Sequence, residues 1–462
     1  MKISFHGAAR GVTGSCYLVS CNGTNILIDC GLYQGPREVE EENDKPFGFE
    51  PSDIDLLLLT HAHLDHCGRI PLLYSRGFRG EIITTPASRE LAKLVMLDAA
   101  KLQEDEARWE SRKQARKGRH KAIEPLFSTL DVLNTLDQFG RNAEYSKPLK
   151  LADGVSAMYY DAGHILGSAS ILLELEEGGR RRRVLFSGDI GYNDRVILRN
   201  PTQPADVDVV VMETTYGDRK HKALQPSIEE MYDAIDTTLQ RGGNVVIPSF
   251  ALERTQEILY YLREGHANKK LPRHMQVFLD SPMAISATEI FRRHPECYDE
   301  STRELFSNGQ DPFGFSGLHF TRETAESIAL NQITGGAVII AGSGMCTGGR
   351  VRHHLKHNLW REDSSVIFVG YAAIGTLARR IVDGAKQVRL FNEDIPVNAS
   401  IYTIGGFSAH ADNEELLSWQ AKTGQPETTY LVHGEEDSMR VFARMLTRTS
   451  VVMPALHDAY EL

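Results

Sequence analysis

The stretch Thr60-His61-Ala62-His63-Leu64-Asp65-His66 brings three imidazoles and one carboxylate together directly after an apolar run that ends in four leucines. Four consecutive bulky apolar residues predict a strand that is buried on both faces. His61 and His63 are two residues apart, so in extended backbone they point the same way and can bind one ion. Asp65 and His66 follow where the chain must turn, and they can face a second ion. Zinc, and with less selectivity manganese or iron, accepts such ligands at neutral pH, so the stretch predicts a metal site.

Three further side chains stand where apolar strands are expected to end. Asp29 closes the run 25–29 before a glycine turn, and is either a turn former or a partner that orients ligand histidines. His164 lies in a glycine-rich turn after the apolar run 158–160, and Asp189 follows the strand pattern 183–186. Taken alone, each is a weak signal. Together with the first cluster they complete two ligand sets, and a carboxylate shared by two ions is typical of two-metal hydrolytic sites.

Length and composition limit the class of protein. A chain of 462 residues predicts two domains, and 41% hydrophobic with 24% charged residues describes a globular protein. The sequence has no run of eighteen apolar residues and no signal-peptide pattern at its start, which predicts no membrane span. Six scattered cysteines without a C-x-x-C pair suit a reducing compartment. These features predict a cytoplasmic protein.

The charge is acidic overall but uneven. A net charge of -11 argues against a generally adhesive nucleic-acid binder. The segment 108–121 nevertheless carries seven Lys and Arg residues against the single acid Glu110, and Arg180-Arg181-Arg182-Arg183 forms a second basic cluster. Each is either a solvated helix face or hairpin turn, or a local surface that attracts phosphate.

Three segments in the second half of the chain complete a family pattern. Val209 to Gly217 places an acid at Glu213, Phe407-Ser408-Ala409-His410-Ala411-Asp412 carries a histidine before a helix start, and Leu431-Val432-His433-Gly434-Glu435 carries another after a strand. With the ligand clusters above, in this order, the chain resembles the metallo-β-lactamase superfamily and its β-CASP nuclease branch, whose motifs A, B and C these segments match. The resemblance implies an α/β fold, a metallo-β-lactamase αββα sandwich with an inserted α/β β-CASP domain. The expected domains are 1–205 and 397–462 for the sandwich and 206–396 for the insertion, where strands alternate with helices.

The resemblance also implies residue roles and two Zn²⁺ ions per chain. The first ion would be held by His61, His63 and His164, the second by Asp65, His66 and His433, and Asp189 would bridge them. Asp29 would orient ligand histidines. His410 would be the general acid and Glu213 the partner that keeps it protonated, with Asp65 counted among the catalytic residues. For His410, capping of the helix that starts near Asp412 is the structural alternative.

A glycine-rich turn inside the insertion is the candidate substrate-binding element. Residues 341–350 follow a buried strand, and glycines let backbone N–H groups approach an anion. The resemblance places this turn at the substrate cleft, which makes Ser343, Gly344, Thr347 and Arg350 candidates for binding phosphate. Arg254 belongs to another segment that resembles the family, and packing at a helix start is the alternative for it.

The expected function is a zinc-dependent ribonuclease. In the family a histidine at motif C goes with members that act on RNA, so His433 points to single-stranded RNA as the partner. We expect mainly endonucleolytic cleavage, with 5′-to-3′ exonuclease activity left open, by a compact form similar to the catalytic core of the pre-mRNA 3′-end cleavage factor. A homodimer is suggested by family analogy alone. The alternatives are a metallo-hydrolase of a small ester or thioester, and a scaffold subunit of an RNA-processing complex.

Overall fold

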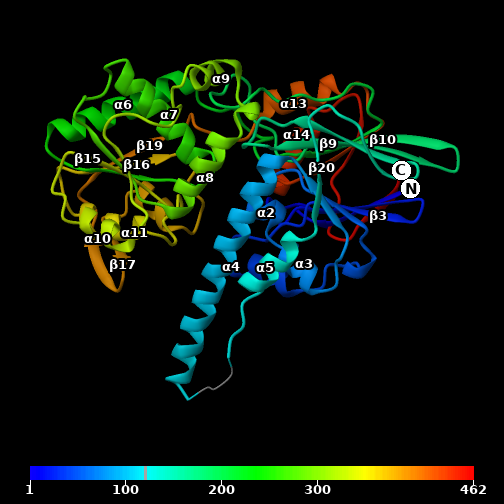
Figure 1. Cartoon of the computed structure of the whole chain (residues 1–462), viewed down its shortest axis with the longest axis horizontal. Helices are drawn as coiled ribbons and strands as arrows, with labels where there is room; N and C mark the ends of the chain where they lie inside the picture. The colour runs from blue at the N-terminus through cyan, green and yellow to red at the C-terminus, as the bar shows by residue number, and fades with distance from the viewer. Residues whose placement is uncertain (119–121) are drawn as a thin grey trace. The chain divides into compact units, whose positions relative to one another are not determined.

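The computed structural model describes residues 1–118 and 122–462, so Arg119 and Lys121 of the predicted basic segment, with His120, lie outside the described part. The chain divides into two units, Met1–Lys220 with His410–Leu462, and His221–Ala409 (Figure 1). The first unit is built from both ends of the chain, and the second is one continuous insertion. Both boundaries fall later in the chain than 205/206 and 396/397, because β11 (Val209–Glu213) pairs within the first unit and β19 (Ser400–Ile404) within the second.

Two seven-stranded sheets form the centre of the first unit. In spatial order, the first sheet contains β22 (Ala459–Glu461), β1 (Lys2–Gly7), β2 (Cys16–Cys21), β3 (Thr24–Ile28), β4 (Leu56–Leu58), β5 (Glu81–Thr84) and β6 (Phe139–Asn142). The second contains β21 (Ser450–Val452), β20 (Thr428–Val432), β11, β10 (Arg180–Phe186), β9 (Ala169–Glu177), β8 (Val155–Asp161) and β7 (Leu149–Ala152). The basic cluster at 180–183 is therefore the start of a hairpin strand.

Alternation along the strands divides the apolar side chains between two layers. Ile171, Val184 and Val211 belong to the core between the two sheets, whereas Leu172 and Leu185 belong to a second core on the outer face. This follows from the two-residue period of a strand, which sends neighbouring side chains to opposite faces. The predicted four-layer arrangement of helix, sheet, sheet and helix is confirmed (Figure 1).

Helices cover the outer face of each sheet. On the first sheet lie α2 (Leu64–Cys67), α3 (Ile70–Ser75), α4 (Pro86–Ala115) and α5 (Thr129–Leu136), and on the second α13 (Asn413–Lys422) and α14 (Glu436–Ala443). Three short helical turns, α1 (Arg37–Glu40), η1 (Glu41–Asp44) and η2 (Pro51–Asp53), belong to the connection from β3 to β4. The helix α4 begins at Pro86 because proline suits the first helical turn and Thr85 caps it, accepting a hydrogen bond from Ser88 N.

The insertion is a parallel α/β unit, as predicted. Its six-stranded sheet has the order β14 (Leu318–Phe320), β13 (Gln276–Leu279), β15 (Ala337–Ala341), β12 (Val245–Pro248), β16 (Ser365–Val369) and β19, and every pairing is parallel. The helices are α6 (Leu224–Gln240), α7 (Arg254–Ala267), α8 (Pro282–Arg293), η3 (Pro295–Cys297), α9 (Glu300–Ser307), α10 (Thr324–Leu330), α11 (Val351–Asn358) and α12 (Leu377–Val382), with a hairpin of β17 (Gln387–Leu390) and β18 (Glu393–Pro396). Strands buried on both faces read as continuous apolar runs, which is why the sequence located them well.

The structure also bears on the expectations about membranes and cysteines. Across the described residues, none of the helices combines the length and hydropathy that a membrane crossing requires. All six cysteines are buried and none forms a disulfide.

Candidate metal centre

The ligand-rich stretch from Thr60 to His66 follows the short strand β4 and lies at one edge of the sandwich. The chain leaves β4 at Leu58 and enters α2 after His63, whose backbone is extended. Gly31 lies against this turn, and a Cβ atom there would stand 1.6 Å from the carbonyl oxygen of Asp65. That carbonyl accepts a hydrogen bond from Ser15 N. Only glycine at position 31 therefore lets the turn carrying Asp65 and His66 pack closely against the strand ends.

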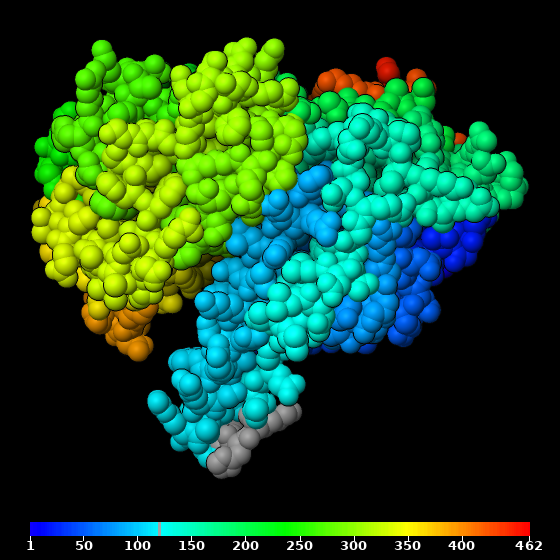
Figure 2. All heavy atoms as spheres, viewed as in Figure 1, coloured from blue at the N-terminus to red at the C-terminus, as the bar shows by residue number. Residues whose placement is uncertain are grey.

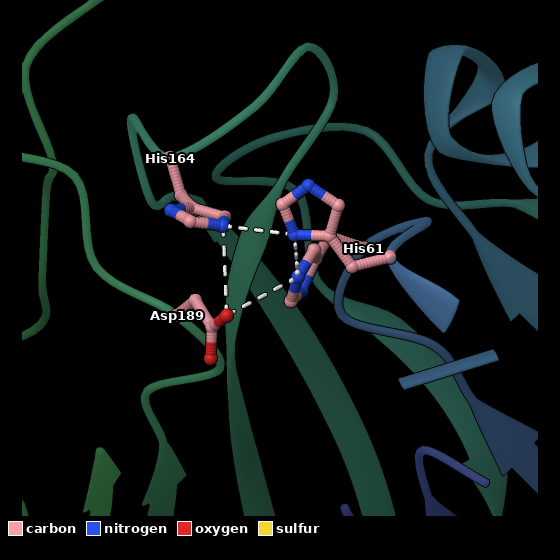
Figure 3. A group of neighbouring side chains, drawn as sticks. His61, His164 and Asp189 are labelled. Atoms are coloured by element: carbon pink, nitrogen blue, oxygen red, sulfur yellow. Dashed lines mark hydrogen bonds and ion pairs between the residues drawn. The ribbon is translucent and has the colours of Figure 1, made fainter. Parts of the chain in front are cut away.

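One set of potential ligand atoms comes from three different segments of the first unit. His61 Nε2 lies 3.2 Å from His63 Nδ1, and His164 Nε2 lies 3.1 Å from the same atom. Asp189 Oδ2 lies 3.4 Å from His61 Nε2 and 3.5 Å from His164 Nε2. Figure 3 shows His61, His164 and Asp189 converging on one point. These four side chains form a group that can hold one metal ion.

A second set lies on the other side of Asp189. His433 Nε2 is 3.2 Å from His66 Nε2 and 3.3 Å from Asp65 Oδ2. Asp189 Oδ1, the second oxygen of the shared carboxylate, is 3.2 Å from His66 Nε2. Asp65, His66 and His433 form a further group that can hold a metal ion. Asp189 thus presents one carboxylate oxygen to each set.

The donor atoms fit cations of the size of zinc. At a zinc–nitrogen distance of 2.0–2.1 Å, neighbouring ligands of a tetrahedral ion lie about 3.3 Å apart, close to the separations found in both sets. Asp189 Oδ1 is buried, and within the described residues it accepts no hydrogen bond. Buried lone pairs that face one another without a proton or a cation between them are costly, which makes both sets suited to metal ions.

Burial and nearby charge shift the pKa values of histidines in the two sets in different directions. Burial lowers the pKa of His61 to about 3 and that of His63 to about 4, and holds the pKa of His164 well below its usual range, so these imidazoles are neutral. Burial opposes protonation of His66 too, but the carboxylates of Asp189 and Asp29 outweigh it and raise the pKa of His66 well above normal. A cation that binds the second set therefore takes the place of a proton on His66.

Hydrogen bonds from outside the two sets orient their imidazoles. His66 Nδ1 lies 2.7 Å from Asp29 Oδ2, which directs Nε2 toward the second set. Asp29 also accepts hydrogen bonds from the Thr60 amide and hydroxyl, both at 2.8 Å, and this hydroxyl lies 3.0 Å from His61 Nδ1. Asp29 thus contacts both the ligand turn and a ligand, which favours the orienting role over a turn former. Sequence reasoning missed Thr60, whose position directly before His61 was the only signal for it.

His433 has a corresponding partner that the sequence reasoning missed. The Thr215 hydroxyl lies 3.1 Å from His433 Nδ1 and donates to the His433 carbonyl at 3.2 Å. Thr215 follows Glu213 within motif A, but its residue type gave no indication of a contact with motif C. The contact depends on β11 and β20 being neighbours, which only the sheet order reveals.

His410 and Glu213 form a pair beside the first set. His410 Nδ1 is 3.1 Å from both oxygens of Glu213 and 4.0 Å from Asp189 Oδ2. Although burial opposes it, the Glu213 carboxylate raises the pKa of His410 to about 9. Helix α13 is capped by Asp412, which accepts hydrogen bonds from Glu414 N and Glu415 N, so capping does not account for His410. Glu213 also belongs, with Asp189 and His433, to a third group of potential ligands.

Comparisons with known proteins agree with this geometry. The family described as metallo-beta-lactamase superfamily matches residues 9–140, the Beta-Casp domain matches 255–381, and the Zn-dependent metallo-hydrolase RNA specificity domain matches 394–454. Ribonuclease TTHA0252 of Thermus thermophilus is 39% identical, over 96% of each chain. The chain belongs to the β-CASP family of metallo-β-lactamase fold nucleases. The predictions of this family, of its fold and of a metallo-hydrolase enzyme are confirmed.

Two more relatives and one solved structure are similar to this chain at lower sequence identity. Transcription termination factor FttA of Methanocaldococcus jannaschii is 31% identical over 99% of this chain and 71% of its own length. An RNase J-like protein of the same organism is 29% identical over 97% and 96%. A crystal structure of a protein of unknown function from Enterococcus faecalis V583 aligns with a TM-score of 0.57 at 12% identity, covering 100% of this chain and 99% of that one, which shows the fold alone.

Within the β-CASP domain, three of the predicted substrate-binding residues share one loop after β15. Ser343 Oγ contacts the backbone of Gly348 on the other side of this loop, and Thr347 is exposed at its tip. Gly344 is buried against the ring of Phe250, which would lie 3.0 Å from a Cβ atom at this position. The side chains of Ser343 and Thr347 could therefore contact a ligand. Gly344 instead allows the loop to pack closely against Phe250.

The two predicted arginines have partners inside the β-CASP domain. Arg350 donates to Asp280 Oδ1 at 2.7 Å and to the carbonyls of Thr321 and Arg322 at 3.1 and 2.8 Å. Arg254 is largely buried, forms an ion pair with Glu257, and its guanidinium carbon lies 5.7 Å from the centre of the Phe407 ring. For Arg254, packing at a helix start is the alternative that this geometry favours.

Proposed function

We propose that this protein is a zinc-dependent ribonuclease that hydrolyses RNA phosphodiester bonds with two metal ions, mainly by internal cleavage. The observation that carries the proposal is the Asp189 carboxylate, which has one oxygen within 3.5 Å of each of two imidazole-rich sets and lies beside the His410–Glu213 pair. Relatives named ribonuclease and transcription termination factor, and a match to an RNA specificity domain, support RNA as the substrate.

The residues would divide the work as follows. One ion would be held by His61, His63, His164 and Asp189, and the other by Asp65, His66, His433 and Asp189. When bound, two such ions activate water at neutral pH and neutralise charge on a phosphoryl group. Asp29 and Thr60 keep the imidazoles of His66 and His61 in their binding orientation.

His410 is suited to protonate the leaving 3′-oxygen. Its Nδ1 faces Glu213, so Nε2 is the nitrogen left to donate a proton to the substrate. Glu213 is buried and accepts a further hydrogen bond from Ile190 N at 2.6 Å, which fixes the carboxylate and with it the ring. A fixed carboxylate that holds an imidazole protonated and oriented is the arrangement that general acid catalysis requires.

The decisive test uses an unstructured, end-labelled RNA, a DNA of the same sequence, and protein loaded with zinc whose metal content is measured. Internal RNA fragments with DNA spared are expected, and nucleotides released successively from the 5′ end would identify an exonuclease component. His410→Ala and Glu213→Gln are expected to keep both ions and lose about a hundredfold or more in cleavage rate. If the protein holds two ions and cleaves neither polymer, the ribonuclease proposal is wrong.

Two further proposals can be checked with the same preparation. A homodimer predicts twice the chain mass of 51.6 kDa in light scattering. A cytoplasmic location predicts that the protein fractionates with the cell interior and not with membranes.

A further inference from the structure

The outer end of helix α4 is a cationic arm that the proposed mechanism does not use. Along this 30-residue helix the buried side chains run from Ala87 to Ala107, and within the described residues none follows. Figures 1 and 2 show the last turns of α4 extending beyond α3 and α5 of the same unit. Between Arg108 and Gly118 the arm carries five Lys and Arg side chains against the single carboxylate of Glu110, in a chain of net charge -11.

One face of the arm combines an exposed indole with cations. Trp109, Arg112, Lys113 and Arg116 follow a spacing of three, four and seven residues, which places them on one side of a helix. Trp109 is 59% exposed, and Lys113 Nζ lies 4.4 Å from the centre of its ring. A single exposed apolar side chain is common on protein surfaces, so the significance of this indole comes from the cations beside it.

The charge of this face is only partly compensated. Lys113 pairs with Glu110 at 3.0 Å and Arg108 with Asp105 at 2.6 Å, on the exposed surface where such pairs are weak. Arg112 and Arg116 form no ion pair within the part of the chain that the structure describes. An aromatic ring surrounded by flexible cations is the combination with which proteins bind single-stranded nucleic acid, since the ring stacks on a base and the cations bind phosphates.

The first turn of α4 ties the arm to the metal centre. Thr85 Oγ1 and Ser88 Oγ both donate to the carbonyl of Gly167, at 2.6 and 2.8 Å, in the turn that carries His164. Arg112 lies roughly 36 Å further along the helix axis at 1.5 Å per residue. In a duplex the phosphates of one strand rise about 3.4 Å each, and an extended single strand covers more length per nucleotide, so a strand held at both places spans at most roughly ten nucleotides from the cleavage site.

We propose that Trp109, Arg112, Lys113 and Arg116 form an accessory site for single-stranded RNA, which holds the substrate within roughly ten nucleotides of the metal centre. The identity of the strand as substrate rests on the proposed function. A second copy of the chain is the less suitable occupant, because a two-fold symmetric contact through this face would bring its cations against the same cations of the partner.

The first experiment measures binding of fluorescently labelled uridine oligonucleotides to zinc-loaded protein that carries His410→Ala, which is expected to keep both ions and to cleave too slowly to interfere. The variant Arg112→Glu/Lys113→Glu/Arg116→Glu is compared with Arg180→Glu/Arg181→Glu/Arg182→Glu, which makes the same charge change on the β9–β10 hairpin. For an RNA of about 30 nucleotides, the variant with the three α4 substitutions is expected to bind about tenfold more weakly than the hairpin variant. The slope of its log binding constant against log salt concentration should be smaller in magnitude by about two. An RNA of about 3 nucleotides should bind equally to both variants because it is too short to span the two places even when fully extended.

The second experiment tests the indole. Trp109→Leu should weaken binding of the long RNA about fivefold or more, and Trp360→Leu, which removes a comparably exposed indole (54%), should leave it unchanged. RNA should quench the intrinsic fluorescence of wild type and of the Trp360 variant, and not that of the Trp109 variant. Because these substitutions lie on the surface, we expect each variant to have the melting temperature of the wild type, and measuring it verifies that the variant is folded.

Each remaining outcome has a distinct meaning. If the α4 variant binds the long RNA as well as the hairpin variant does, the proposal is wrong. It is also wrong if the α4 variant only converts a dimer to a monomer, because the face is then a contact between copies. Unchanged hydrolysis of the small diester bis(p-nitrophenyl) phosphate by the α4 variant shows an intact metal centre. A wild type that binds RNA through α4 but cleaves none would overturn the proposed function and leave this inference standing.

Discussion

The two units each bury an aspartate near the end of a strand, Asp189 beside several histidines and Asp280 beside His354, yet the two clusters are built in opposite ways. Around Asp189, in the first unit, imidazole and carboxylate atoms face one another at 3.1–3.5 Å, and one carboxylate oxygen accepts no hydrogen bond from any residue that the structure describes. Around Asp280, in the β-CASP domain, every carboxylate oxygen has a donor. Arg350 donates to Oδ1, and Ser327 and His354 lie 2.6 Å from Oδ2.

The comparison separates a binding site from a structural ion cluster. A guanidinium and a hydroxyl complete the Asp280 cluster from within the chain, so it needs no external cation. Among the described residues no Lys or Arg forms an ion pair with Asp189, whose charged partners are imidazoles with nitrogen atoms that suit metal ions. A buried aspartate beside a histidine occurs in both clusters, but among the described residues only the Asp189 cluster gathers a group of ligands that could hold a metal ion.

The largest expected effect comes from removing the shared carboxylate. Asp189→Asn should lower RNA cleavage by about a thousandfold or more, because both sets lose an anionic ligand and the ions lose their bridge. The bound zinc should fall below two ions per chain by elemental analysis. A chelator should lower the melting temperature of wild type, whose folded state the ions stabilise, and change that of Asp189→Asn much less.

Asp280→Asn is the matched control for that experiment, since it makes the same chemical change in the completed cluster. It should retain two zinc ions. Loss of zinc from Asp280→Asn, or full zinc content in Asp189→Asn, would contradict the distinction between the two clusters.

The next effect concerns the stability of the β-CASP domain. Asp280→Asn leaves the buried end of Arg350 without its anion, and we expect the free energy of unfolding to fall by about 3 kcal/mol. Urea unfolding followed by Trp360 fluorescence, which reports on this domain, measures the change. In the double variant Asp280→Asn/Arg350→Met the two losses should not add, because the second removes a charge that the first left unpaired. Additive losses would show that Arg350 stabilises the domain by another route.

Motif and strand pattern predicted the metal centre because its ligands lie next to strands that the sequence shows clearly. His61, His63, Asp65 and His66 lie within one turn, and Asp189 directly follows an apolar strand. Such local patterns can be recognised in the sequence without knowing the order of strands in the sheet.

Contacts between residues that are far apart in the chain and meet only in the folded structure could not be predicted from the sequence. Arg350 looked like a phosphate ligand because its neighbours are glycines, and nothing in that segment points to Asp280, seventy positions earlier. The contact of Thr215 with His433 depends in the same way on two strands that are adjacent in the sheet but far apart in the chain. The domain boundaries moved for this reason too, because strand pairing and not composition decides to which unit β11 and β19 belong.

The smallest expected effect is the pH dependence that the Asp280 cluster adds to stability. Burial opposes ionisation of Asp280, but the hydrogen bonds from His354, Ser327 and Arg350 outweigh it and lower its pKa to about 2. Because this folded pKa lies below the ordinary value near 3.9, the contribution is fully present above about pH 4 and is lost as the pH falls toward 2, amounting to about 2 kcal/mol. The stability difference between wild type and Asp280→Asn should therefore be constant from pH 7 to about 4.5 and shrink below that. A difference that stays constant down to pH 3 would mean that Asp280 acts through packing and not through its charge, and the contrast with Asp189 would then concern shape alone.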